Sequence, residues 1–214
     1  MARGLARLWF RTHRREGPEP PSGPTLVVLN HPNGLLDPLV ATALLRPAPG
    51  WLAKATLWRI LPLRPWLAAF RAIPVSRPKD GGASPAATAE SFRRVHEVLA
   101  QGGTVGLFPE GISHTGADLA PLKTGAARMA LSSPVPPAIL PAGLVYGERA
   151  LFRHNVLLRL GAPVAWEDLR SRGTDPEAVL ELTARIRAAL LPLTLHGTEA
   201  ARLTLAQDLA WLLA

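Results

Sequence analysis

The 214-residue sequence contains no cysteine. This absence excludes a disulfide framework, a thiol nucleophile and cysteine-ligated zinc or iron–sulfur sites. Charged residues are also scarce, at 19% of the chain against 48% hydrophobic residues. No apolar run reaches the roughly 18–20 residues that a membrane-spanning helix needs, because arginine and proline interrupt the longest ones. A chain of this length is expected to form one domain with a well-formed core and a short appended element.

Acidic residues are too few to balance the basic ones. Lysine and arginine number 24 against 16 aspartate and glutamate residues, which gives a formal net charge of +8. This excess favours anionic partners, which are nucleic acid, an acidic membrane surface or phosphorylated small molecules. We predict no nucleic-acid partner, because the arginines do not gather with aromatic residues on one strand and no known binding motif occurs.

The first fifteen residues predict an amphipathic basic helix over 1–15. Leu5, Leu8 and Trp9 fall at i, i+3 and i+4 on one stripe. A separate line of the same helix carries Arg3, Arg7, Arg11 and Arg14. Such a helix can lie in the interface of an anionic membrane, or it can pack on the domain with its arginines solvated. Because the segment lacks the apolar core of a secretory signal, we expect a cytoplasmic protein that is peripherally membrane-associated and has no transmembrane span.

The remainder of the chain alternates between strand and helix signals. The proline- and glycine-rich residues 16–24 predict a linker. Apolar runs predict strands over 25–29, 51–57, 72–77, 104–107, 137–146 and 155–164, whereas capping patterns predict helices from Asp37 and over 85–101, 121–133 and 175–193. The fold class is therefore α/β, a single domain over 25–195 with a mostly parallel or mixed central sheet flanked by helices. An apolar helix over 196–214 ends the chain and either packs on the domain or touches lipid.

The first candidate motif is "NHPNGLLD" at 30–37, directly after the strand predicted over 25–29. Ligand sites of open α/β sheets gather beyond the carboxyl ends of strands. His31 can take a proton from a hydroxyl, and Asp37 can fix the tautomer of the imidazole if the Asn-Gly turn folds back between them. The alternative is that Asp37 only caps the following helix and His31 only completes a turn.

A second motif, "FPEG" at 108–111, follows another predicted strand. Gly111 permits unusual backbone angles at which amide groups face an anion, and Glu110 can accept a hydrogen bond from a substrate hydroxyl or pair with an arginine. Arg77, Lys54 and Lys123 are the candidate phosphate-binding cations. The sequence has neither a G-x-S-x-G motif nor a cysteine, so a transfer reaction on an external hydroxyl is favoured over a covalent enzyme intermediate. Acidic residues never fall at ligand spacing with histidine, so no metal is predicted.

Four blocks, "NHPNGLLD", "AIPVSR", "LFPEG" and "AILPAGLV", occur in an order and spacing that resemble the motifs of the glycerolipid acyltransferase superfamily. Its members include lysophosphatidate and glycerol-3-phosphate acyltransferases. The resemblance covers about two-thirds of the chain, from about residue 25 to about residue 165. The segment "LKTGAARMAL" also looks like the helix that follows the third block in that family.

The resemblance implies roles for individual residues. His31 would be the general base on the glycerol hydroxyl, and Asp37 would orient it. The donor would be an acyl-CoA or an acyl carrier protein thioester, with no further cofactor. The acceptor would be lysophosphatidate in an anionic membrane, so the implied pathway is phospholipid biosynthesis. The residues implied in holding the substrate phosphate are Arg77, Phe108, Pro109, Glu110, Gly111 and Lys123, and the possible site-lining residues are Asn30, Lys54 and Pro141.

Two departures from the family pattern bear on the acceptor. Five residues separate His31 from Asp37, where four is usual, and a similar longer form occurs in branches that acylate glycerol 3-phosphate. Ile112-Ser113 stands where Thr-Arg is common, which removes one phosphate-binding cation. Glycerol 3-phosphate is therefore an alternative acceptor. A phospholipid transacylase and a non-enzymatic lipid-binding module are further alternatives.

Overall fold

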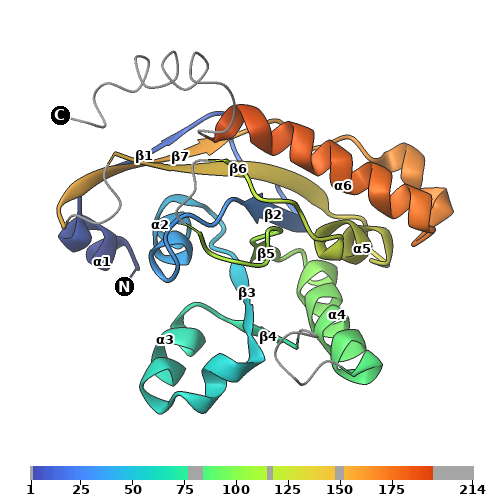
Figure 1. Ribbon diagram of the computed structural model, residues 1–214, viewed down its shortest axis with the longest axis horizontal. Helices are drawn as coiled ribbons and strands as arrows, with labels where there is room; N and C mark the ends of the chain where they lie inside the picture. The colour runs from blue at the N-terminus through green and yellow to red at the C-terminus, as the bar shows by residue number, and fades with distance from the viewer. Residues whose placement is uncertain (1, 77–83, 115–117, 148–151, 195–214) are drawn as a thin grey trace.

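A computed structural model describes residues 2–76, 84–114, 118–147 and 152–194. Within these residues one sheet has seven strands (Figure 1): β1 Phe10–Glu16, β2 Thr25–Leu29, β3 Gly50–Lys54, β4 Ile73–Val75, β5 Thr104–Leu107, β6 Ala138–Tyr146 and β7 His154–Leu160. Their order across the sheet is β1-β7-β6-β2-β5-β3-β4. The β6–β7 pair is antiparallel and the other neighbouring strands are parallel, so the predicted mixed α/β sheet is confirmed.

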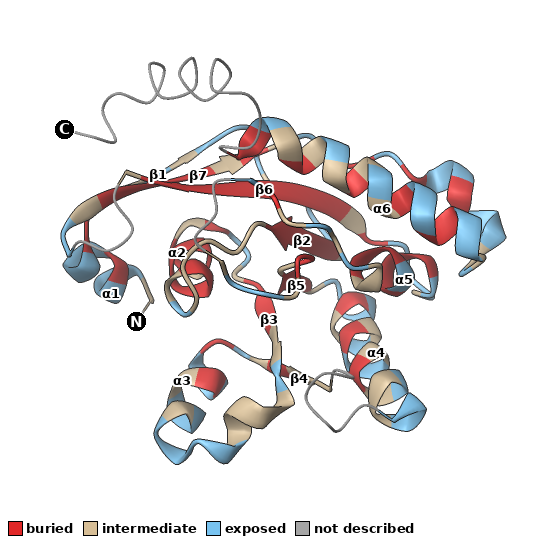
Figure 2. Ribbon diagram, in the orientation of Figure 1, coloured by how far each residue is buried: buried red, intermediate tan, exposed pale blue. Residues whose placement is uncertain are grey.

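Helices cover both faces of this sheet. The α-helices are α1 Ala2–Trp9, α2 Leu36–Leu44, α3 Arg64–Ala69, α4 Pro85–Ala100, α5 Gly125–Leu131 and α6 Pro176–Leu190. Short 3₁₀ segments are η1 Ala55–Arg59, η2 Leu61–Leu63, η4 Glu167–Arg172 and η5 Leu191–Leu193. Helices α1 and α2 pack on one face, with Val27 and Leu29, whereas α4, α5 and α6 pack on the other, with Leu26 and Val28. Because both faces are covered, β2 is apolar at every position after Thr25 and fully buried (Figure 2).

The N-terminal helix is shorter than the predicted range of 1–15. It ends at Trp9, and residues Phe10–Glu16 form β1. This strand forms one edge of the sheet and pairs in parallel with β7, so its backbone groups find partners there, and the Phe10 side chain is 3% exposed in the core. Periodicity alone missed this change because the arginines continue at near-helical spacing into the strand. The helix predicted over 196–214 lies outside the described residues.

The parallel strands bring their carboxyl ends to one edge of the sheet. His31 lies just beyond the end of β2, and Phe108 begins the turn that follows β5. Lys54 ends β3, the neighbour of β5. Segments that lie far apart in sequence thus meet at this edge, which is where an open α/β sheet binds its ligands. Across the described helices, the combination of length and apolar character needed to cross a bilayer does not occur.

The close approach of β6 to the segment that follows α6 depends on Gly143. A β-carbon at this position would lie 2.0 Å from the carbonyl oxygen of Leu193, closer than atoms can approach. We expect Gly143→Ala to lower the free energy of unfolding by about 1–3 kcal/mol, because the strand or the segment must shift. Gly125→Ala is the matched control, because nothing lies within 4 Å of its β-carbon. Urea denaturation of both variants checks this, and equal stability would contradict it.

Candidate active site

His31 and Asp37 form a hydrogen-bonded pair. The Nδ1 atom of His31 lies 2.8 Å from Asp37 Oδ2. Since a carboxylate accepts, Nδ1 carries the proton and Nε2 is the basic nitrogen, directed away from Asp37. Asp37 is fully buried, whereas the His31 side chain is 19% exposed. The imidazole is thus fixed in one tautomer and remains accessible to a substrate.

Asp37 is not the helix cap that its sequence position predicts. Helix α2 begins at Leu36, its N-cap residue is Leu35, and no side-chain capping bond is made there. Asp37 Oδ2 instead accepts from the backbone N–H of Asn33 at 2.7 Å, as well as from His31. The "NHPNG" turn therefore folds back onto the carboxylate, which favours the catalytic interpretation of the motif over simple capping.

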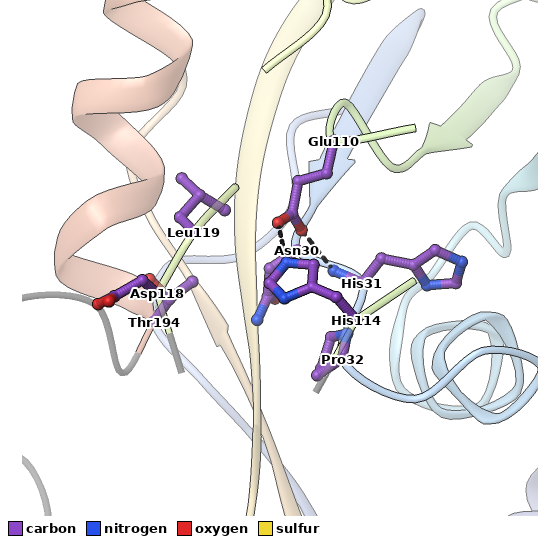
Figure 3. Close-up of a pocket in the computed structure, with 8 residues that line it drawn as sticks. All are labelled: Asn30, His31, Pro32, Glu110, His114, Asp118, Leu119 and Thr194. Atoms are coloured by element: carbon purple, nitrogen blue, oxygen red, sulfur yellow. Dashed lines mark hydrogen bonds and ion pairs between the residues drawn. The ribbon is translucent and has the colours of Figure 1, made fainter. Parts of the chain in front are cut away.

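Glu110 joins the two strand-end loops. Its side chain is 1% exposed, and Oε1 accepts from the backbone N–H of His31 at 2.8 Å. Oε2 accepts from His114 Nε2 and from the backbone N–H of Ala120 at 2.8 Å. Figure 3 shows this carboxylate above the Asn30–His31 segment, with dashed contacts to His31 and His114. Glu110 was predicted to contact the substrate, but its oxygens face protein donors, so its role in the structure is to hold the loop that carries His31.

Further backbone contacts connect the same loops. The N–H of Gly34 donates to Ser113 Oγ at 2.9 Å, and the N–H of His114 donates to the carbonyl of His31 at 3.2 Å. Ser113, where the family often has arginine, thus braces the histidine turn. The imidazole of His31 stacks on Phe108 with ring centroids 3.9 Å apart, and Phe108 stacks on Trp51 at 5.2 Å. This stack restricts rotation of the His31 ring.

The predicted phosphate-binding residues gather partly at this site. Gly111 has φ of 70°, the left-handed conformation that turns the chain after Glu110. Lys123 is exposed, its N–H donates to the Pro109 carbonyl at 2.7 Å, and its Cγ would lie 3.5 Å from a β-carbon at Gly111. The backbone and the stem of the Lys123 side chain therefore lie against the Pro-Glu-Gly turn.

The other predicted site residues occupy different positions. Lys54 is exposed at the end of β3, in register with Val75 of β4. Asn30 bonds Leu144 of β6 in both directions, at 3.0 and 2.7 Å, and so ties the histidine turn to that strand. Pro141 is buried in mid-strand opposite Val28, away from the dyad. Arg77 lies outside the described residues.

A small pocket opens beside the dyad. It is lined by Asn30, His31, Pro32, Glu110, His114, Asp118, Leu119 and Thr194 (Figure 3). His114 lines this pocket while its Nε2 contacts Glu110. Tyr146 was missed altogether, and its hydroxyl donates to Asp37 Oδ1 at 2.6 Å. The available signal was strand length, because a strand over 137–146 that pairs in parallel with the shorter strand over 25–29 continues past its end, beside the residues that follow it.

Comparison with known proteins agrees with this geometry. The family model described as Acyltransferase matches residues 11–145. Glycerol-3-phosphate O-acyltransferase 2 of Saccharomyces cerevisiae is 34% identical over 113 residues, which are 49% of this chain and 15% of the yeast protein. Glycerol-3-phosphate O-acyltransferase 1 of the same yeast is 33% identical over 128 residues, 55% of this chain and 17% of that protein. The matched segments thus span less than a fifth of these two relatives.

A solved structure shares the fold. The crystal structure of the 1-acyl-sn-glycerophosphate (LPA) acyltransferase PlsC from Thermotoga maritima superposes with a TM-score of 0.59 at 20% identity, covering 87% of this chain and 77% of that one. At this identity the likeness concerns the fold. The family match extends over more than half of the chain and includes the His31–Asp37 pair and the Pro-Glu-Gly turn. The protein therefore belongs to the Acyltransferase family, within the glycerolipid acyltransferase superfamily that its four motif blocks resemble.

Proposed function

We propose that the protein transfers a fatty acyl group from an acyl-CoA or acyl carrier protein thioester to the hydroxyl of lysophosphatidate. The observation that carries this proposal is the His31–Asp37 contact of 2.8 Å at the carboxyl edge of the sheet. His31 Nε2 takes the hydroxyl proton while the oxygen attacks the thioester carbonyl carbon. When the tetrahedral intermediate collapses, the C–S bond breaks and the imidazolium returns its proton to the thiolate. No covalent acyl-enzyme is needed.

Glycerol 3-phosphate is the second candidate acceptor. The five residues between His31 and Asp37, one more than is usual, favour this acceptor. The two yeast relatives named as glycerol-3-phosphate O-acyltransferases also favour it. Both acceptors carry the same phosphate, and Lys123 beside Gly111 supports a site for that group. Amide groups of the turn would add donors for the phosphate oxygens.

The exposed surface of α1 supports the proposal that the protein binds its acceptor at an anionic membrane. Ala6 and Phe10 face the core, whereas Leu5, Leu8 and Trp9 are 39%, 61% and 41% exposed. The arginines of this segment supply the charge that attracts anionic lipid. His13 adds little positive charge to this surface. Burial, and then the neighbouring charge of Arg7, lower the pKa of its imidazole.

A second exposed apolar segment follows β3 at the same edge of the sheet. Ile60 and Leu61 are 48% and 65% exposed, and Arg59 and Arg64 beside them are also exposed. Figure 1 shows the η1–η2–α3 segment projecting from the sheet, and Figure 2 shows it largely exposed or half-buried. Two apolar and basic surfaces thus flank the edge that carries His31, an arrangement suited to a lipid acceptor.

The acyl-transfer proposal is tested with a radiolabelled acyl-CoA, offered in parallel with lysophosphatidate and glycerol 3-phosphate. We expect His31→Ala to lower kcat by about 10²–10⁴-fold, the usual contribution of a general base. Asp37→Asn should also lower kcat, because the asparagine amide no longer fixes the tautomer of the His31 imidazole. His96→Ala is the matched control, since His96 lies on α4 and contacts the Met129 carbonyl.

Product that survives His31→Ala would contradict the assigned base. No product with either acceptor, and none with an acyl carrier protein thioester, would favour a transacylase or lipid-binding module.

The phosphate assignment has its own test. Lys123→Gln should raise the KM for the acceptor about tenfold with little change in kcat, because a charge-assisted contact to the phosphate is lost. Arg128→Gln is the control, since it removes one exposed charge from α5, where Arg128 lies over the Phe92 ring. Equal KM values for the two variants would remove Lys123 from the phosphate site.

Membrane contact through α1 is checked by cosedimentation with phosphatidylglycerol vesicles. Leu8→Asp should weaken vesicle binding, because it places a charge at the apolar interface and repels anionic lipid. Leu180→Asp on α6 is the matched control, since Leu180 is 63% exposed and Leu8 is 61% exposed. Binding of the wild type should also fall as salt is added. If both variants bind as the wild type does, α1 is not the contact surface.

A further inference from the structure

The second oxygen of Asp37 is held by a residue that the acyltransferase motifs do not predict. Oδ2 contacts His31, whereas Oδ1 accepts the hydroxyl hydrogen of Tyr146 at 2.6 Å. Asp37 is fully buried and Tyr146 is 8% exposed. The phenol, the carboxylate and the imidazole therefore form a continuous chain of hydrogen bonds that leads from the core to the accessible Nε2 of His31.

Tyr146 is itself firmly placed. It ends β6, where it pairs with Val156 of β7, and Leu144 two residues earlier is bonded to Asn30. Its ring packs against Phe10, with centroids 5.9 Å apart. The hydroxyl thus approaches Asp37 from the sheet, whereas Asp37 itself comes from α2 and His31 from the end of β2.

We propose that Tyr146 is a positioning residue that fixes the rotation of the Asp37 carboxylate so that Oδ2 faces His31 Nδ1. This rests on the proposed acyl-transfer function. A carboxylate held through one oxygen can rotate about its Cβ–Cγ bond, whereas donors on both oxygens fix its plane. Orientation of this kind acts on the reaction rate, because the base must point at the hydroxyl when the proton moves. Tyr146 does not contact the reacting atoms and acts through Asp37.

Tyr146 can be observed selectively by NMR, because it is the only tyrosine in the sequence. Protein labelled with carbon-13 at the tyrosine Cζ gives a single resonance that reports on the hydroxyl hydrogen bond. We expect Asp37→Asn to shift this resonance. We also expect Tyr146→Phe to weaken or abolish the downfield proton signal of His31 Nδ1–H in nitrogen-15 histidine-labelled protein. His31→Ala identifies that signal.

In the acyl-transfer assay, Tyr146→Phe should lower kcat by about 10- to 100-fold and leave the KM of the acceptor unchanged, because orientation and not binding is lost. Phe10→Leu is the matched control, since it alters the packing on the same ring and retains the hydroxyl. It should keep both the His31 signal and a kcat near that of the wild type. A structural role alone would predict similar losses in the two variants.

The outcomes separate the two proposals. If the wild type turns over and Tyr146→Phe keeps both kcat and the His31 signal, Tyr146 has no positioning role. If the Tyr146 resonance is insensitive to Asp37→Asn, the hydrogen bond itself is overturned. A wild type without turnover under all donor and acceptor conditions would overturn the acyl-transfer function, and the resonances would still decide whether Tyr146 orients the dyad.

Discussion

The site depends on the buried carboxylate of Glu110, which joins the ends of two neighbouring parallel strands. It accepts from the backbone of His31 after β2 and from the backbone of Ala120 beyond the turn after β5. A buried carboxylate costs several kcal/mol of desolvation unless donors satisfy it, so the loops are required to bring their N–H groups to it. The same requirement that stabilises Glu110 therefore determines where the His31 backbone lies.

Asp37 follows the same principle on the other side of His31. It accepts from His31, from the Asn33 backbone and from Tyr146. His31 thus lies between two buried carboxylates with different tasks: one holds its backbone and the other holds its ring. Stacking on Phe108 restricts the ring from a third direction. In the proposed reaction, a general base with this many constraints loses little rotational freedom when the substrate binds.

The placement of exposed residues complements this rigid centre. Leu8 of α1 and Leu61 of η2 project from the edge of the sheet that carries His31, on opposite flanks. The β6–β7 pair supports the first flank, because the N–H of Arg153 donates to the carbonyl of Trp9 at 2.8 Å. The mixed sheet, with β6 and β7 antiparallel, thus places the apolar, basic surfaces and Nε2 of His31 on one side of the protein. This geometry supports the proposed transfer to a hydroxyl near a lipid surface.

The sequence by itself determined the α/β class, most strand and helix positions and the motif blocks, and it offered the pairing of His31 with Asp37 as one of two interpretations. These features are local, since apolar runs, caps such as Ser84 and the Asn-Gly turn act over a few neighbouring residues. Only the tertiary structure decided that residues 10–16 form a strand, that Glu110 faces protein donors, and that Tyr146 holds Asp37. Each of these depends on which strands are neighbours, because a buried polar group binds whatever donor the sheet order places beside it. Tyr146 and Asp37 are 109 residues apart in sequence, and the parallel pairing of β2 with β6 brings them into contact.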